Sequence, residues 1–448
     1  MISLALAALM TSPQLMNEPF RPQYHFTAPK GWLNDPNGLV FYKGEYHLFY
    51  QHNPFGTEWG NMTWGHAVSK DLVHWKHLPN ALEPDASGTM FSGSAVVDWK
   101  NTSGLGSKNN PPLVLLYTAA GGTNEASKGV KFTQGLAYSP DGRAFTKLTT
   151  NPILAHIEAE NRDPKVFWHE PTKAWIMALY LDGDRFALFR SPDLKNWSRT
   201  GDVAILGSSE CPDLFELPVD GDPKDKKWVF WGASGHYLMG EFDGYKFVPD
   251  GKPLLNGFGK NDYAAQTFSD EPKNRRIQIS WMRGGKYPGM PFNQQMSLPR
   301  ELKLLTSYAT PRLATTPVKE LEKLRGKQIS WTKSADGNTA SAKTDSELLE
   351  LRVVLPSGND GLVQIGGLEI RYLPGKLTVG DLGTISHRPE GAEFDLTIYL
   401  DRTSVEVFMD RGLGHVTSCV MPSTGERDII VKWAKNARAW ELKSAVGK

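Results

Sequence analysis

Hydrophobic residues along the first two thirds of the chain form short paired runs. Each run is rich in Val, Ile, Tyr, Phe and Trp, and a polar turn separates the two members of a pair, as in a β-hairpin. The pairs are LVFYKGEYHLFYQ (39–51), SGSAVVDWKN with PPLVLLYTAA (92–101 and 111–120), KVFWHEPTKAWIMALY (165–180), LFELPVDGDPKDKKWVFWG (214–232) and AAQTFSDEPKNRRIQISWM (264–282). This pattern predicts antiparallel strands throughout the region.

A short repeat accompanies these strand pairs. An Asp is followed four residues later by an aromatic residue in four places: Asp71 and Trp75, Asp141 and Phe145, Asp193 and Trp197, and Asp243 and Phe247. Five similar units of several short strands predict a β-propeller, which repeats one small sheet around an axis. We therefore expect a five-bladed propeller over 18–303, because a large sandwich gives no reason for the repeat.

The pattern of apolar and turn-forming residues changes after residue 303. The run LLTSYATPRLATTP is typical of a linker, and apolar residues at 318, 321 and 324 predict a short helix, so 304–325 is expected to be a linker with a short helix. Alternating runs such as LLELRVVL (348–355) and SVEVFM (404–409) then predict a β-sandwich over 326–448. The expected fold class is all-β, a five-bladed propeller followed by a C-terminal sandwich.

Charge and composition narrow the function. The 448 residues carry 50 Lys and Arg against 49 Asp and Glu, so a net charge of +1 gives no reason to expect nucleic acid or an anionic membrane as partner. The 14 tryptophans suit the apolar faces of a neutral carbohydrate. Two cysteines, Cys211 and Cys419, predict free thiols rather than a disulfide framework. The oligomeric state is not encoded in these patterns.

The first residues resemble an export signal. The run MISLALAALMTS has apolar and small residues but no basic start, and residues 1–17 are interpreted as a signal-like segment of a secreted or periplasmic protein. No other stretch approaches the length of a membrane span.

Three acidic residues begin the first strands of different units. Asp35 precedes PNGLVFY, Asp163 precedes PKVFW and Glu210 precedes CPDLF. Equivalent positions in a propeller face one axis, so these carboxylates are expected to share one funnel. Proline after Asp35 and Asp163 favours an extended backbone at both. The stretch GWLNDPNG, which contains Asp35, is typical of a tight turn.

Carboxylates that share a site titrate together. Arg162 is expected to keep Asp163 ionised, and Asn34 and Asn37 to donate near Asp35, whereas Glu210 has only Cys211 beside it and is expected to have a raised pKa. An ionised carboxylate facing a protonated one can cleave a glycosidic bond, the first as nucleophile and the second as acid and then base.

The chain also resembles a known family. The motifs WLNDPNG (32–38), QHNP (51–54), WGNMTWGHAVSKDLVHW (59–75), FSGS (91–94), RDP (162–164), EC (210–211) and YAAQTF (263–268) are similar to those of glycoside hydrolase family 32, the β-fructofuranosidases. LDRTSVEVFM (400–409) resembles that family's sandwich signature.

The resemblance implies a retaining hydrolase that needs no cofactor and releases terminal β-linked fructose from sucrose, inulin or levan. It assigns the nucleophile to Asp35, the general acid/base to Glu210 and transition-state stabilisation to Asp163. Residues that match the family's fructose pocket are Asn34, Gln51, Trp59, Phe91, Ser92 and Arg162.

One position departs from the family pattern. Gly285 stands where many exo-acting members carry a second tryptophan, so it is expected to border the leaving group, and Gly285→Trp to change substrate preference more than stability. The motif WGNM (59–62) favours fructans over sucrose as the preferred substrate. Five histidines between His47 and His77 are expected to be structural, and no metal is predicted.

Three alternatives remain open. A fructosyltransferase would use the same residues, and an inverting arabinan- or xylan-cleaving propeller would need its acids farther apart. A non-catalytic carbohydrate-binding propeller would lose one acid. The linkage preference, β-2,1 or β-2,6, is not determined.

Overall fold

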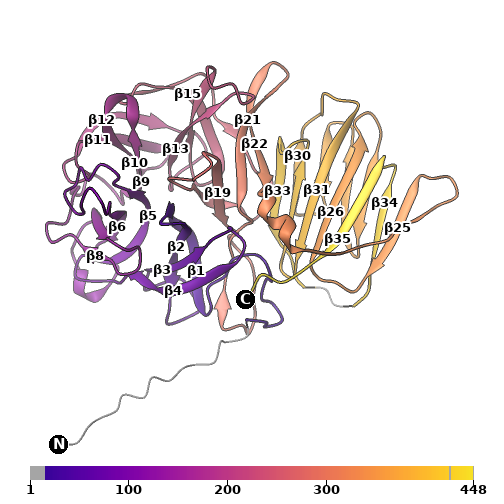
Figure 1. The fold of residues 1–448 in the computed structure, drawn as a ribbon, viewed down its shortest axis with the longest axis horizontal. Coiled ribbons are helices and arrows are strands. Elements are labelled where there is room, and N and C mark those ends of the chain that lie inside the picture. The colour runs from indigo at the N-terminus through magenta and orange to yellow at the C-terminus, as the bar shows by residue number, and fades with distance from the viewer. Residues whose placement is uncertain (1–15, 423–424, 447–448) are drawn as a thin grey trace, which may run out of the picture.

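The computed structural model describes residues 16–422 and 425–446, and almost all of its regular structure is strand. Five small sheets precede two larger ones that pack face to face, and Figure 1 shows the two parts lying side by side. This all-β architecture, a propeller followed by a sandwich, is the predicted fold class. The signal-like segment falls outside the described residues except for its last two.

The first part contains five sheets of four or five strands. The first sheet consists of β1 (Gly31–Tyr42), β2 (Glu45–Asn53), β3 (Thr63–Ser69) and β4 (Trp75–Leu82), with β20 (Phe292–Asn293) beside β1. The second consists of β5 (Thr89–Val97), β6 (Leu113–Ala120), β7 (Thr133–Ser139) and β8 (Thr146–Lys147). The third consists of β9 (Arg162–His169), β10 (Ala174–Asp182), β11 (Arg185–Ser191) and β12 (Ser198–Ala204).

The other two sheets complete the propeller. The fourth consists of β13 (Asp213–Pro218), β14 (Lys226–Trp231), β15 (His236–Phe242), β16 (Phe247–Pro249) and β17 (Leu254–Leu255). The fifth consists of β18 (Tyr263–Thr267), β19 (Arg276–Trp281), β21 (Arg300–Ser307) and β22 (Thr310–Pro317). Strand β5 contacts both β1 and β9, and β1 contacts β18, so the first strands of the sheets surround a common centre. Two 3-10 turns, η1 (Glu125–Ser127) and η2 (Glu170–Thr172), lie in connecting loops.

The sequence repeat has a physical cause. Asp71, Asp141, Asp193 and Asp243 each lie between the third and fourth strands of a sheet. In all four turns the carboxylate accepts the backbone N–H groups two and three residues farther on. The same side chain therefore closes the same turn in four sheets, which is why the motif recurs.

The expected linker begins too early. The chain remains in the fifth sheet to Pro317, because β21 and β22 form a hairpin in which Leu302, Leu304 and Leu313 pack into a hydrophobic cluster. The predicted short helix follows as η3 (Lys319–Leu324), with Leu321 and Leu324 buried. The prediction of a linker over 304–317 was wrong since the Pro- and Thr-rich hairpin resembled a loop in composition.

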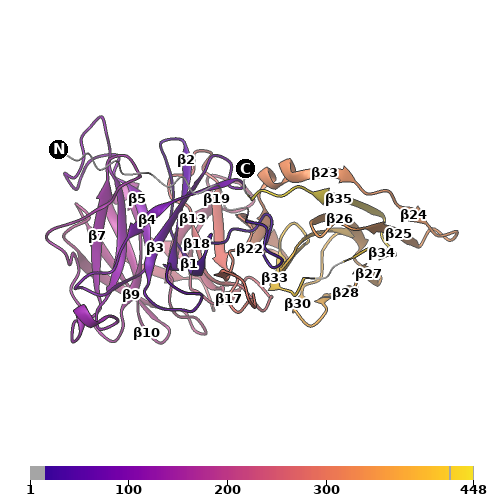
Figure 2. The same cartoon turned by 90° about the horizontal axis from the view of Figure 1, so that it is seen from below.

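The second part is a sandwich of two sheets around one core. One sheet has the order β23 (Arg325–Gln328), β35 (Asn436–Leu442), β26 (Leu349–Pro356), β31 (Glu393–Asp401), β32 (Ser404–Met409) and β33 (Gly414–Cys419). The other has the order β24 (Thr332–Lys333), β25 (Thr339–Thr344), β34 (Arg427–Lys432), β27 (Gly361–Ile365), β28 (Leu368–Leu373), β29 (Lys376–Val379) and β30 (Gly383–Ser386). Strand β22 contacts β32 and β33 at the junction seen in Figure 2. None of the helices in the described ranges has the length and apolar character of a membrane span.

A buried ionic cluster joins the two parts. His25 Nδ1 lies 2.9 Å from Asp401 Oδ2, and its Nε2 lies 3.0 Å from Glu406 Oε1, with all three side chains inaccessible to solvent. Burial would lower the pKa of His25, but its hydrogen bonds to Asp401 and Glu406 and their charges outweigh that effect and raise the pKa to about 9. His25 thus carries a charge that ties the segment before β1 to the sandwich.

This cluster predicts a pH-dependent share of stability. Because the pKa of His25 is about 9 in the folded protein and 6.5 for an unperturbed histidine, its contribution to stability is full below about pH 6.5 and is lost as the pH rises through about 9. The wild type should be more stable than His25→Gln, and the difference in their free energies of unfolding should be about 3 kcal/mol larger at about pH 6 than at about pH 10. Urea unfolding at the two pH values measures this difference. His156→Gln, outside the cluster, is the control. An equal difference at both pH values would contradict the assignment.

Candidate active site

One cavity of about 790 Å³ opens at the ends of the innermost strands where the three predicted acids lie. We call it the acid cavity. All nine predicted site residues line it: Asn34, Asp35, Gln51, Trp59, Phe91, Ser92, Arg162, Asp163 and Glu210. It also includes Gly121, Gly122, Thr123, Phe132, Glu160, Tyr263, Trp281 and Arg283. Sequence reasoning did not assign a role to Tyr263, Glu160 or Arg283, although Tyr263 begins one of the quoted family motifs.

The stretch around Asp35 is a bent strand rather than a tight turn. It lies within β1, whose pairing with β2 shifts register between Leu33 and Pro36 and again between Asn37 and Val40. Such irregularities bend a strand and re-aim its side chains. The prediction of a turn was wrong because turn-forming residues here serve a bulged strand.

Asp35 is held at the cavity wall by its neighbours. Ser92 Oγ donates to Asp35 Oδ2 at 2.7 Å, and the thiol of Cys211 lies 3.7 Å from the same oxygen. Burial raises the pKa of Asp35, the hydrogen bonds from Ser92 and Asn34 lower it in part, and the charge of Glu210 raises it further.

The backbone around Asp163 is strained. Asp163 has a φ of 66°, so the expectation of an extended conformation before Pro164 was wrong. Its N–H donates to Thr118 Oγ1 at 2.9 Å, and its Oδ2 accepts the N–H of Cys211 at 3.0 Å. These hydrogen bonds hold Asp163 in a left-handed backbone conformation, although a residue before proline normally prefers an extended one. Strained backbone conformations of this kind are common at functional sites.

The pKa of Asp163 is strongly raised as well. Burial raises the pKa to about 7, the charge of Arg162 opposes this, and the charges of Glu210 and Asp35 add to it. Arg162 Nε lies 3.9 Å from Asp163 Oδ2, too far for a hydrogen bond.

Arg162 forms its ion pair with Glu210 instead. Arg162 Nη2 donates to Glu210 Oε1 at 2.6 Å, and the hydroxyl of Tyr263 donates to Glu210 Oε2. Burial favours the neutral form, but these two hydrogen bonds and the Arg162 charge outweigh it and lower the pKa of Glu210. The expectation that Glu210 has a raised pKa and that Arg162 keeps Asp163 ionised was wrong. Arg162 is next to Asp163 in the sequence, but its guanidinium lies closer to Glu210. The cavity therefore favours the charged form most at Glu210, while the pKa values of Asp163 and Asp35 are raised.

Cys211 lies beneath the acids with its thiol directed at Asp163 Oδ2, 3.5 Å away. Burial, together with the neighbouring carboxylates, raises the pKa of Cys211 well above its usual value, so the thiol stays protonated and donates. None of the five histidines between His47 and His77 lines the acid cavity. Among the described residues no group of three His, Cys, Asp or Glu side chains is arranged to hold a metal ion.

Aromatic and basic residues form the opposite wall of the cavity. The Trp281 ring lies 6.1 Å from that of Trp32 and 6.3 Å from that of Tyr263. The Arg283 guanidinium carbon lies 4.8 Å from the centre of the Tyr263 ring. This wall gives apolar ring faces together with a charged donor beside Glu210.

Gly285 does not line the acid cavity. A Cβ atom at this position would lie 2.5 Å from the hydroxyl of Tyr287, whose side chain is buried. The expectation that Gly285 borders the leaving group stays a prediction, and the Tyr287 side chain occupies the space beside this position.

Comparisons with known proteins agree with this arrangement. Residues 25–317 match the glycosyl hydrolases family 32 N-terminal domain, and residues 371–445 match the family 32 C-terminal domain. A levanase of Bacillus subtilis is 38% identical over 96% of this chain and 70% of its own length. An extracellular exo-inulinase of Aspergillus awamori is 31% identical over 91% of this chain and 90% of its own length.

Solved structures show the same fold. The crystal structure of the Aspergillus awamori exo-inulinase superimposes with a TM-score of 0.85 at 28% identity, covering 96% of this chain and 99% of its own. A fructofuranosidase of Schwanniomyces occidentalis complexed with fructosylnystose gives a TM-score of 0.82 at 26% identity, covering 97% and 99% of the two chains.

The position of Gly285 generates a prediction. Gly285→Ala should lower the free energy of unfolding by about 1 to 3 kcal/mol, because the added carbon overlaps the rigid and buried Tyr287 ring. Gly251→Ala is the matched control, since a Cβ there meets nothing within 4 Å. Chemical unfolding measures both. A Gly285→Ala protein as stable as the wild type would show that the loop has room for a side chain.

Proposed function

Because the chain belongs to glycosyl hydrolases family 32, we propose that its acid cavity releases terminal β-D-fructofuranosyl residues from fructans, fructo-oligosaccharides and sucrose by a retaining double displacement. One observation carries the proposal. Asp35 in β1, Asp163 in β9 and Glu210 just before β13 meet in one cavity, where Arg162 lies 2.6 Å from Glu210 and 3.9 Å from Asp163.

Glu210 and Asp163 differ in their exposure to solvent, and this difference supports different roles for them. The side chain of Glu210 is 30% exposed and that of Asp163 is 4% exposed. The more open carboxyl is the one that a leaving group and an incoming water can reach, so we assign the general acid and base to Glu210. The buried Asp163, fixed by the N–H of Cys211, suits binding of sugar hydroxyls.

In the first step Asp35 attacks the anomeric carbon of the fructosyl unit. The bond from that carbon to the leaving oxygen breaks, and the oxygen takes the proton of Glu210. In the second step a water attacks the same carbon, Glu210 takes the proton of that water, and the Asp35 ester bond breaks. Two displacements at one carbon retain its configuration.

Substrate binding places the proton where the first step needs it. The pKa of Asp163 is raised to about 7, while the pKa of Glu210 is lowered. Sugar hydroxyls that donate to Asp163 stabilise its charged form, and its charge in turn raises the pKa of Glu210. Arg162, hydrogen-bonded to Glu210 and 3.9 Å from Asp163, is the cation that connects the two carboxylates.

Neutral donors and rings provide the rest of the fructose site. Asn34, Gln51 and Ser92 supply hydrogen-bonding groups. Trp59 is 55% exposed and stands edge-on to Phe91, with ring centres 5.9 Å apart, at the rim of the cavity. A cavity that closes on one terminal sugar favours release of single fructose units, and no residue in it calls for a cofactor.

We also propose that the protein is exported. The similar exo-inulinase of Aspergillus awamori is extracellular by name. The apolar run within residues 1–17 is consistent with a signal peptide.

Replacing the two principal acids separates their roles. Asp35→Ala should lose nearly all turnover on every substrate, because the nucleophile is needed in both steps. Glu210→Ala should lose far more on sucrose than in the first step on a fructoside with a good leaving group, which needs no proton. With that substrate the leaving group should appear in a burst, and azide should restore turnover by releasing the fructosyl enzyme.

Stopped-flow release of the leaving group and mass spectrometry of a fructosyl azide measure these outcomes. Glu241→Ala, an exposed acid on β15, is the matched control and should resemble the wild type. Equal loss on both classes of substrate, without burst or azide adduct, would rule out Glu210 as acid and base.

A further inference from the structure

A second cavity, of about 690 Å³, lies at the opposite ends of the same innermost strands. Its lining includes the last residues of β5, the end of β9 around His169, the middle of β13 and the residues after β18. Along β9, Asp163 of the acid cavity and His169 of the second cavity are six residues apart, about 20 Å, and Lys165 between them also lines the second cavity. We call it the tryptophan cavity.

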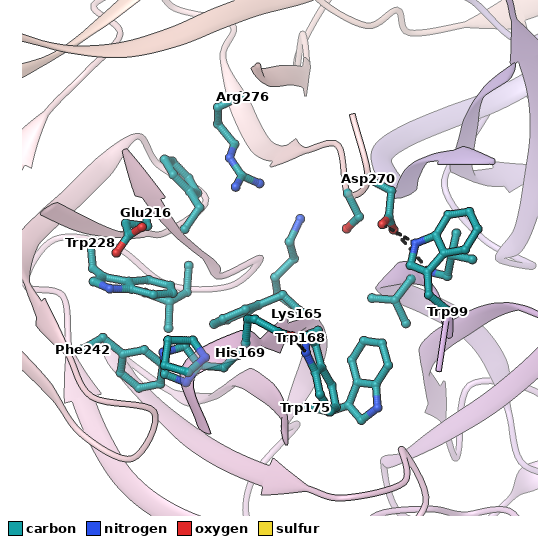
Figure 3. A pocket seen from close by; sticks show the side chains of 18 of the residues that line it. Trp99, Lys165, Trp168, His169, Trp175, Glu216, Trp228, Phe242, Asp270 and Arg276 are labelled. Carbon is teal, nitrogen blue, oxygen red and sulfur yellow. Dashed lines mark hydrogen bonds between the residues drawn. The ribbon is translucent and has the colours of Figure 1, made fainter. Parts of the chain in front are cut away.

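Aromatic rings form its walls, as Figure 3 shows. The rings belong to Trp99, Phe167, Trp168, Trp175, Trp228 and Phe242. Trp168 stands edge-on to Trp175 with ring centres 5.1 Å apart, and Trp228 lies 5.0 Å from Phe242. Aromatic rings packed against each other in this way hold fixed orientations around an open space.

Two of the indole rings are also anchored at their polar edges. Trp99 Nε1 donates to Asp270 Oδ1 at 2.8 Å, and Trp168 Nε1 donates to Glu170 Oε2 at 2.5 Å. Trp99 nevertheless remains 58% exposed. A large apolar ring that is held in place and left open to solvent has the properties of a stacking platform.

A guanidinium faces the same space. Figure 3 shows Arg276 extending into the cavity opposite Lys165. Lys165 is paired, since its Nζ lies 3.1 Å from Asp213 Oδ2 and donates to the carbonyl of Thr267 at 2.8 Å. Arg276 donates only through Nη1, to Thr267 Oγ1 at 3.3 Å and Phe268 O at 3.5 Å. Within the described part of the chain no carboxylate forms an ion pair with it, so donors remain for a ligand.

The charges around the cavity identify the kind of ligand. Three basic residues of the lining face four acidic ones, which leaves a formal charge of −1; they are Lys100, Lys165 and Arg276 against Glu170, Glu216, Asp243 and Asp270. This charge gives an anion no net attraction. A neutral ligand with many hydroxyls can accept from Arg276, donate to the carboxylates and place its C–H faces on the rings.

We propose that the tryptophan cavity is a second, non-catalytic saccharide site that binds a segment of a fructan chain. The choice of fructan rests on the proposed function of the acid cavity, whereas the saccharide class rests on the cavity itself. Side chains of Ser94, Lys165 and Gln266 make buried hydrogen bonds between the innermost strands, so the site does not feed the acid cavity through the centre. It would instead retain long polymers at the opposite face of the propeller.

Binding stoichiometry tests the proposal without turnover. The Asp35→Ala protein should bind two molecules of fructosylnystose in isothermal titration calorimetry. Adding Trp99→Ala should weaken one of the two by about tenfold or more, because the stacking ring is removed. Adding Trp433→Ala, a matched exposed tryptophan of the sandwich that is 44% accessible, should leave both unchanged.

The outcomes separate the two sites. A single binding event that is insensitive to Trp99→Ala would overturn the second site and leave the proposed function intact. A single event abolished by Trp99→Ala would support the second site and count against the acid cavity. Displacement of fructosylnystose from the Trp99-dependent site by inorganic phosphate would show an anion site and also overturn the proposal. Unchanged thermal midpoints confirm that each variant is folded.

Discussion

Two carboxylates of the acid cavity, Asp163 and Glu210, lie within 4 Å of the Arg162 guanidinium, and the chemistry depends on which of them Arg162 pairs with. Arg162 donates to Glu210 at 2.6 Å and remains 3.9 Å from Asp163. Burial and the charges of neighbouring carboxylates raise the pKa of Asp163 and of Asp35, whereas the hydrogen bonds from Tyr263 and Arg162 lower the pKa of Glu210. We infer that a sugar which engages Asp163 shifts the proton demand toward Glu210, so binding and acid catalysis are linked through one side chain.

The fold provides the rigidity that such crowding requires. Left-handed backbone conformations occur at Asp163, Glu210 and Cys211, where φ is 66°, 57° and 41°, and these strained residues come from the starts of two neighbouring sheets. Strain of this kind persists only where the surroundings impose it. The closed Asp turns between outer strands and the buried His25 cluster with the sandwich stabilise the scaffold around them.

The sequence predicted much of this organisation and failed at specific contacts. The recurring Asp turn revealed the sheets, and the acids at strand starts were found because equivalent positions face one axis. Sequence proximity misassigned Arg162 to Asp163, since the left-handed turn directs its guanidinium to Glu210 in the next sheet. The surroundings of Gly285 and the tryptophan cavity could not be predicted either, because both depend on packing between loops far apart in the chain.

The two cavities thus have different properties. The acid cavity has acidic residues around a guanidinium, and the tryptophan cavity has fixed indole rings. The central claim is that the acid end removes one fructose at a time through a covalent intermediate on Asp35. Time-resolved ¹³C NMR of inulin labelled at C2 of fructose follows the sugar at the moment of its release. The account predicts β-D-fructofuranose as the only first product, and first release of the α anomer or of mixed oligosaccharides would contradict it.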